Sequence, residues 1–152
     1  MRITAKVDYA IRAAAELAAA PRNTPVKGEQ LARAQGIPVR FLENILRELR
    51  RAGIVSTQRG ADGGYRLARP ATDITLAEII RTVEGPLAAV QGVRPEQLQC
   101  VGAAHELPDV WIALRASLRS VLEAVTLADL ASGRLPASVR ELSRDPDART
   151  PH

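Results

Sequence analysis

The segment 27–69 constrains the fold most, because two short helical patterns and a glycine-rich hairpin pattern follow one another directly there. Residues 27–35 form a short helical pattern that Gly36 stops, since glycine accepts the left-handed conformation common at helix ends. Pro38 then opens a second helix, which Gly53 ends. Its apolar stripe consists of Phe41, Leu42, Ile45, Leu46, Leu49 and Ala52. Two helices joined by a short glycine-containing turn predict a helix-turn-helix unit.

Two short stretches of alternating polarity follow at residues 54–58 and 65–68, separated by Arg-Gly-Ala-Asp-Gly-Gly. Such alternation is typical of strands, and a glycine cluster between two strands is typical of a hairpin loop. A helix-turn-helix followed at once by a hairpin predicts a winged helix, with the hairpin as the wing.

Helical patterns also flank this unit. Residues 4–19 have apolar side chains at helical spacing, with Thr4 as the expected N-cap. Residues 76–83 form another helix, in which Thr75 is the N-cap and Glu78 completes a capping box. Residues 85–107 show little periodicity and predict a long loop, and loops of this length inside compact domains are usually functional.

The expected fold is mainly α with a small β-hairpin. The predicted domains are a winged helix-turn-helix (1–84), an effector or sensor loop (85–107), a dimerisation helix (108–131) and a flexible tail (132–152) with at most one helical turn near Val139. A helix over 108–130 would extend about 35 Å, longer than so small a domain can cover. We therefore expect a second copy of the chain to cover its stripe, formed by Trp111, Leu114, Leu118, Val121, Leu122 and Val125.

Composition excludes several classes of protein. The single cysteine, Cys100, excludes an intramolecular disulfide framework and any site built from several thiolates of one subunit. No run approaches the roughly 18 apolar residues of a membrane span, so the chain is expected to be cytoplasmic and unprocessed. With two histidines and neither a Ser/His/Asp set nor a closely spaced carboxylate pair beside a base, the sequence predicts no enzyme.

Charge is distributed unevenly along the chain. Residues 1–70 contain thirteen Lys or Arg and six Asp or Glu, whereas residues 71–152 contain eight and eleven. The basic half is the candidate surface for a polyanion, and double-stranded DNA is the expected partner. The polar face of the second helix suits base reading, because Arg pairs with guanine, Asn with adenine, and Glu accepts from cytosine.

The predicted DNA contacts fall into three groups. The phosphate anchors are expected to include Arg2, Lys6, Arg40 and Arg47, and Glu43, Asn44 and Arg59 are placed nearer the bases. The remaining candidates lie at the start of the second helix and in the wing: Val39, Gly60, Gly63, Gly64 and Tyr65. The glycines let backbone approach a sugar-phosphate chain closely. A nucleotide-binding loop is disfavoured because the Lys-Ser/Thr of a P-loop is missing.

These same segments resemble the bacterial winged-helix regulators of the Rrf-two (Rrf2) family, of the IscR, NsrR and CymR type. The resemblance covers about residues 1–131 and is carried by the Arg-Ile-Thr near the start, by 41–55, by the Gly-Gly-Tyr wing within 59–70, by 74–80 and by 125–130. It implies a homodimer with crossing long helices, each winged helix entering a major groove of a two-fold symmetric operator. It also implies that Glu43 reads a base and that Arg59 lies where the wing reaches DNA.

Many members of the family hold an iron-sulfur cluster with three cysteines in the loop before the long helix. Here Cys100 stands alone, and the resemblance places His105 and the partner's Asp8 where further ligands would lie. A sparse metal or cluster site of Cys100, His105 and the partner's Asp8 is one alternative, and a redox switch at Cys100 is another. The main expectation is that no cofactor and no metal is bound, with the effector unknown.

The function predicted from the sequence is a homodimeric, sequence-specific DNA-binding transcriptional regulator, expected to be a repressor. A cluster- or thiol-dependent redox-sensing regulator of the same family is one alternative. A protein-interaction module that uses the long helix and binds no DNA is the other.

Overall fold

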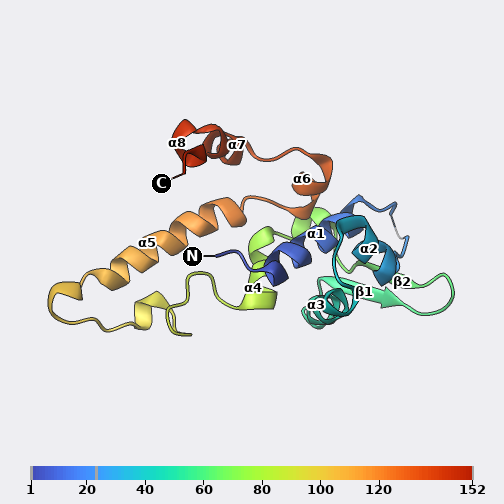
Figure 1. The fold of residues 1–152 in the computed structure, drawn as a ribbon, viewed down its shortest axis with the longest axis horizontal. Coiled ribbons are helices and arrows are strands. Elements are labelled where there is room, and N and C mark those ends of the chain that lie inside the picture. The colour runs from blue at the N-terminus through green and yellow to red at the C-terminus, as the bar shows by residue number, and fades with distance from the viewer. Residues whose placement is uncertain (1, 23, 152) are drawn as a thin grey trace.

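The computed structural model describes residues 2–22 and 24–151, and Figure 1 shows a helical head from which one long helix extends as an arm. The α-helices and strands, in chain order, are α1 (Ala5–Ala19), α2 (Gly28–Gln35), α3 (Val39–Arg51), β1 (Val55–Gln58), β2 (Gly64–Leu67), α4 (Leu76–Glu84), α5 (Leu107–Leu122), α6 (Leu127–Ser132), α7 (Ala137–Arg144) and α8 (Pro146–Arg149). The predicted helix-turn-helix and hairpin are confirmed, with bounds shifted by one or two residues. No helix in the described part of the chain is long and apolar enough to cross a membrane.

The head is built around α1, which packs against α2, α3, α4 and α6. Its inward positions are small: Ala10, Ala13 and Ala14 are fully buried. Because alanine adds only one methyl group to the backbone, the neighbouring helices approach α1 closely. Thr4 caps the helix as predicted, its hydroxyl accepting the Val7 N–H at 3.2 Å.

The wing is a two-stranded antiparallel hairpin in which Val55 pairs with Leu67 and Gln58 with Gly64. The hairpin is attached to the helix-turn-helix by an isolated bridge between Tyr65 and Val26, where each backbone N–H donates to the other carbonyl at 2.8 Å. The bridge fixes the base of the wing next to the start of α2.

The long helix ends earlier than the sequence pattern predicts. α5 stops at Leu122, so the arm helix is about 24 Å long at 1.5 Å per residue. A new helix, α6, begins after Thr126, whose hydroxyl accepts from the Asp129 N–H while the Asp129 carboxylate accepts from the Thr126 N–H. This capping box competes with helix continuation and breaks the predicted single helix into two.

The break returns the chain to the head. Thr126 bridges to Thr75, the Leu76 N–H donates to the Val125 carbonyl at 3.0 Å, and Val125 and Leu127 are buried. The prediction of Val125 as a dimerisation residue is therefore wrong, because its side chain is covered within one protomer. The head also extends beyond the predicted 1–84, since α6 completes it.

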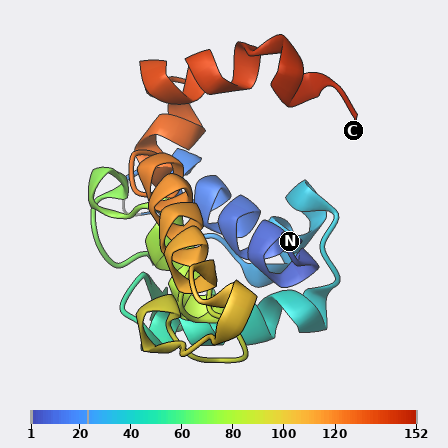
Figure 2. The same ribbon diagram turned by 90° about the vertical axis from the view of Figure 1, so that its left-hand side faces the viewer.

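Two other predictions need correction. The segment after residue 132 contains α7 and α8 rather than a flexible tail, and Arg140 holds its start by donating to the carbonyls of Gly133 and Leu135. Thr75 caps α4 as predicted, but the Glu78 carboxylate pairs with Arg69 instead of completing a capping box. α7 and α8 lie on the opposite side of the molecule from α3 in both views (Figures 1 and 2).

Candidate nucleic-acid interface

The exposed face of α3 presents the polar side chains predicted for base reading. Leu42, Ile45, Leu46 and Leu49 are buried in the head, which fixes the rotation of the helix. Arg40, Glu43, Asn44 and Arg47 are exposed along the other side. Arg47 donates to the Asn44 side-chain oxygen at 3.1 Å, so these two side chains form one hydrogen-bonded pair on the surface. The helix can therefore enter a groove without disturbing the core.

The turn before α3 sets the angle between the two helices. Gly36 adopts a left-handed conformation (φ 63°), and the Ile37 N–H donates back to the Ala32 carbonyl at 2.9 Å. The Ile37 side chain is buried, which anchors the turn in the core. Pro38 then occupies the N-cap position of α3. Because proline has no backbone N–H, no donor at this position is left without a hydrogen-bond acceptor.

The wing tip depends on its glycines for steric reasons. A Cβ on Gly63 would lie 2.2 Å from the Gln58 carbonyl oxygen, and one on Gly64 would lie 2.6 Å from the Val26 carbonyl oxygen. Glycine is thus required both to close the loop and to attach the hairpin. Arg59 and Gly60 are exposed in this loop. Tyr65 is half-buried and bridged to Val26, which places it at the base of the wing rather than at its tip.

The two N-terminal cations differ in their surroundings. Arg2 is exposed, whereas the Lys6 ammonium lies 2.9 Å from a Glu48 carboxylate oxygen and donates to the Val83 carbonyl at 2.8 Å. Lys6 therefore ties α1 to α3 and α4, and only part of its charge is available to DNA. Sequence reasoning missed Glu48 as its partner, because the two residues are far apart in the chain.

Basic residues at the C-terminal end of α3 extend the charged surface. Arg50 and Arg51 are exposed and, like Arg40, Arg47 and Arg59, form no ion pair with any described residue. Arginines without carboxylate partners are available for phosphate or base edges. The helix and the wing thus both present exposed arginines, with Glu43 and Asn44 between the arginines of the helix.

Apolar side chains also reach this surface. Val39 is 40% exposed, and Phe41, which the sequence pattern assigned to the core, is 39% exposed. The Phe41 ring meets Tyr9 edge to face at 5.7 Å, so it is held at the boundary of the core. Apolar groups at such positions can contact thymine methyl groups. No signal in the sequence distinguishes this edge position from a buried one.

The α5 arm presents the other predicted interface. None of its residues is buried in the protomer, although Trp111, Leu114, Leu118, Val121 and Leu122 give it an apolar stripe. Leu122 contacts the head core, and the others lie farther along the arm. Val110, which was not predicted, is 55% exposed. The stripe residues are only partly buried in the protomer, so this amphipathic helix retains apolar surface for a second surface to pack against.

Comparison with known proteins identifies the family. Residues 3–133 match the Rrf2 family, described as "Iron-dependent Transcriptional regulator". The chain belongs to the Rrf2 family. With the exposed α3 face and the wing, this makes it a DNA-binding transcriptional regulator of the helix-turn-helix type.

Individual relatives agree with this assignment. Rv1287 of Mycobacterium tuberculosis, named among the HTH-type transcriptional regulators, is 50% identical over 145 residues, which cover 95% of this chain and 90% of that one. CymR of Bacillus subtilis is 36% identical over 132 residues, covering 87% and 91%. Among solved structures, B. subtilis CymR matches with a TM-score of 0.74 at 33% identity, covering 88% of this chain and 98% of that one. The structure of IscR from T. potens matches with a TM-score of 0.70 at 30% identity, covering 100% and 93%.

The family description names iron, and the sequence offers Cys100, His105 and the partner's Asp8 as a sparse ligand set. Cys100 is the single thiol of the sequence. His105 is exposed, with Nδ1 3.0 Å from the Gly102 carbonyl oxygen and Nε2 2.9 Å from a Glu106 carboxylate oxygen; because a neutral imidazole carries one N–H, it donates to one of these acceptors at a time. Asp8 forms an ion pair with Arg12 at 2.8 Å. Within residues 2–22 and 24–151 no three His, Cys, Asp or Glu side chains converge on one point.

Proposed function

We propose that this Rrf2-family regulator acts as a homodimeric repressor that binds a two-fold symmetric operator in double-stranded DNA. The apolar stripe of α5, of which no residue is fully buried in the protomer, is the observation that carries the dimer. In a two-fold symmetric dimer the stripe of one copy packs against the same stripe of the other, so a single surface covers the apolar residues of both chains. The two heads then lie apart, each with its α3 directed outward.

Each α3 would enter a major groove, and the two half-sites would lie about 34 Å apart, one turn of DNA. Glu43 and Asn44 stand at the middle of the exposed face, where a recognition helix reads bases. Arg40 and Arg47 flank them and would contact phosphates. Arg59 at the wing would reach the adjacent minor groove or backbone. A dimer seated on a promoter in this way excludes other proteins from it, which is the basis for expecting repression.

The experiment begins with selection of bound fragments from genomic DNA, followed by titration of the selected duplex with fluorescence anisotropy. Arg59→Ala should weaken binding by about 1–3 kcal/mol if the side chain touches a base edge. Arg47→Ala should weaken binding to all sequences alike and lower the salt slope by about one.

Arg134→Ala is the matched control, because Arg134 is exposed and follows α6, which lies away from α3 in Figure 1. It removes the same charge without touching the proposed interface. Equal effects of all three substitutions would mean that net charge, and not α3 and the wing, accounts for binding. Absence of duplex binding at low salt would favour a protein-interaction module instead.

We further propose that regulation does not use an iron-sulfur cluster held by this chain. Support comes from the single thiol of Cys100 and from the absence, among the described residues, of three His, Cys, Asp or Glu side chains placed to hold a metal. Protein purified without oxygen should show no visible absorption and no stoichiometric iron. A coloured sample whose absorption disappears in Cys100→Ser would overturn this proposal.

A further inference from the structure

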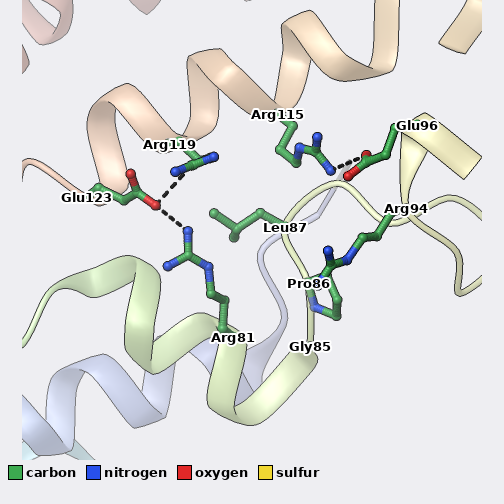
Figure 3. Close-up of a pocket in the computed structure, with 9 residues that line it drawn as sticks. All are labelled: Arg81, Gly85, Pro86, Leu87, Arg94, Glu96, Arg115, Arg119 and Glu123. Atoms are coloured by element: carbon green, nitrogen blue, oxygen red, sulfur yellow. Dashed lines mark hydrogen bonds and ion pairs between the residues drawn. The ribbon is translucent and has the colours of Figure 1, made fainter. Parts of the chain in front are cut away.

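A cavity lies where the arm meets the head, between the end of α4, the segment after it and α5 (Figure 3). We call it the junction cavity; it has a volume of about 480 Å³, and its lining residues are Arg81, Gly85, Pro86, Leu87, Arg94, Glu96, Arg115, Arg119 and Glu123. Its size falls within the range of sites for small molecules, about 300–1,000 Å³. Figure 3 shows Leu87 in the middle, with guanidinium groups around it from α4, the loop and α5.

The lining has an excess of positive charge. It contains four arginines and two glutamates. Hydrogen bonds from Arg115 lower the pKa of Glu96, and hydrogen bonds from Arg81 and Arg119 lower the pKa of Glu123, so both carboxylates are ionised at neutral pH. Two positive charges therefore remain unmatched in the cavity.

The ion pairs account for three of the four arginines. Glu123 is shared by Arg81 and by Arg119, the latter at 3.0 Å, and Glu96 pairs with Arg115 at 2.6 Å. No described carboxylate lies within ion-pairing distance of Arg94. Its side chain runs over Pro86 toward the cavity (Figure 3). Arg94 is thus available to an anion, and so is one of the two positive charges of Arg81 and Arg119, which share the single negative charge of Glu123.

A purely structural ion-pair network explains this arrangement less well. The paired side chains are between 22% and 53% exposed, and exposed pairs contribute about 0–1 kcal/mol each. Such a network accounts for Arg81, Arg115 and Arg119 but leaves Arg94 without a carboxylate partner among the described residues. An excess of arginine around a small apolar floor, with Leu87 buried at its base, is instead the arrangement that binds oxyanions with an organic body.

The cavity and the proposed dimer surface use different faces of α5. At 100° per residue, the ion-pairing residues Arg115, Arg119 and Glu123 and the stripe residues Trp111, Leu114, Leu118, Val121 and Leu122 centre about 110° apart around the helix axis. A second copy packed on the apolar stripe is therefore centred away from the residues that line the junction cavity.

We propose that the junction cavity binds a small organic dianion, a dicarboxylate or a phosphate monoester, and so couples a metabolite to DNA binding. The coupling rests on the proposed function, but the binding does not. A ligand held by Arg94 of the loop, by Arg81 of α4 and by Arg119 of α5 connects the head to the arm and sets the angle between them. Because binding at two sites is reciprocal, a ligand that prefers one head–arm angle changes operator affinity.

Binding is tested on the full chain without DNA, by calorimetry and thermal shift. The probes are succinate for the dicarboxylate class and glycerol 3-phosphate for the phosphate class, with acetate at the same ionic strength as the monoanion reference. A dianion of one class should bind and raise Tm above the acetate value. Arg94→Gln and Arg119→Gln should each weaken its binding by about tenfold or more, as expected for a lost charge-assisted hydrogen bond.

Arg134→Gln is the matched control, which loses the same charge outside the cavity and should bind the probe like the wild type. Binding of neither dianion above the acetate response overturns the proposal, as does equal weakening by Arg94→Gln and Arg134→Gln. Coupling is tested separately, by titrating the selected duplex with and without the bound probe. Dianion binding with unchanged operator affinity retains the site and rejects its coupling, whereas absence of duplex binding rejects only the proposed function.

Discussion

Truncation of Leu127 tests whether α6 belongs to the head. Leu127 is fully buried, its N–H donates to the Ile74 carbonyl at 2.9 Å, and it lies in the same core cluster as the alanines of α1. Leu127→Ala removes three carbons from this cluster and leaves the backbone hydrogen bond in place. The substitution therefore isolates the packing of α6 on the head.

The expected loss follows from this packing. Leu→Ala substitutions at buried positions lower the free energy of unfolding by about 2–5 kcal/mol, and the loss rises with the volume of the cavity that remains. The side chains of Ala10, Ala13 and Ala14 in α1 are too short to move into the space. We therefore expect the free energy of unfolding to fall by about 3–4 kcal/mol. For a chain of this size, the corresponding decrease in Tm is about 6–15 °C.

Urea unfolding followed by circular dichroism measures this loss, at several protein concentrations because dissociation of the proposed dimer would add to the transition. Leu142→Ala is the control: Leu142 lies in α7, is 57% exposed and should change stability by less than about 0.5 kcal/mol. If Leu127→Ala matches Leu142→Ala in the free energy of unfolding, α6 does not complete the head. The reasoning from the capping box would then be refuted.

Three further predictions concern the wing, the arm and the junction between α5 and α6. Gly63→Ala places a methyl group against the Gln58 carbonyl and should weaken duplex binding at least as much as loss of Arg59, with a small change in Tm; unchanged anisotropy titrations would contradict it. Leu118→Glu should give a monomer by light scattering with an unchanged circular dichroism spectrum, and an unchanged mass would count against the stripe. Hydrogen bonds from the Thr126 N–H and hydroxyl lower the pKa of Asp129, so its ionised form stabilises the fold above its unfolded pKa, and this contribution is lost as pH falls through the lower folded value. The Tm difference between wild type and Asp129→Asn should therefore be largest near neutral pH and shrink in acid; a constant difference would contradict this assignment.

The head could be predicted from the sequence because its signals are local. Gly36 and Pro38 mark the turn between α2 and α3, and the Gly63–Gly64 pair marks the hairpin loop. Each of these residues meets a backbone requirement that few others can meet, so the pattern specifies the turn without knowledge of the tertiary structure. The predicted readers on α3 also lie on one exposed face, since helical spacing alone determines which residues share a face.

The remaining features depend on contacts between distant segments. The apolar spacing after Pro108 continues through Leu130, and only the capping box of Thr126 and Asp129 separates α5 from α6. That signal is local and could have been found. By contrast, the pairing of Lys6 with Glu48 and the edge position of Phe41 follow from how α1 meets α3, which no short-range pattern records.

Hydroxyl-radical footprinting on a selected operator tests the central claim most directly. If two copies joined by their α5 arms place one α3 each in successive major grooves, protection should appear as two patches on one face of the duplex, about 10 base pairs apart. The two patches should appear together as protein is added. A single patch, or two patches that fill independently, would contradict a dimer built on the α5 arm.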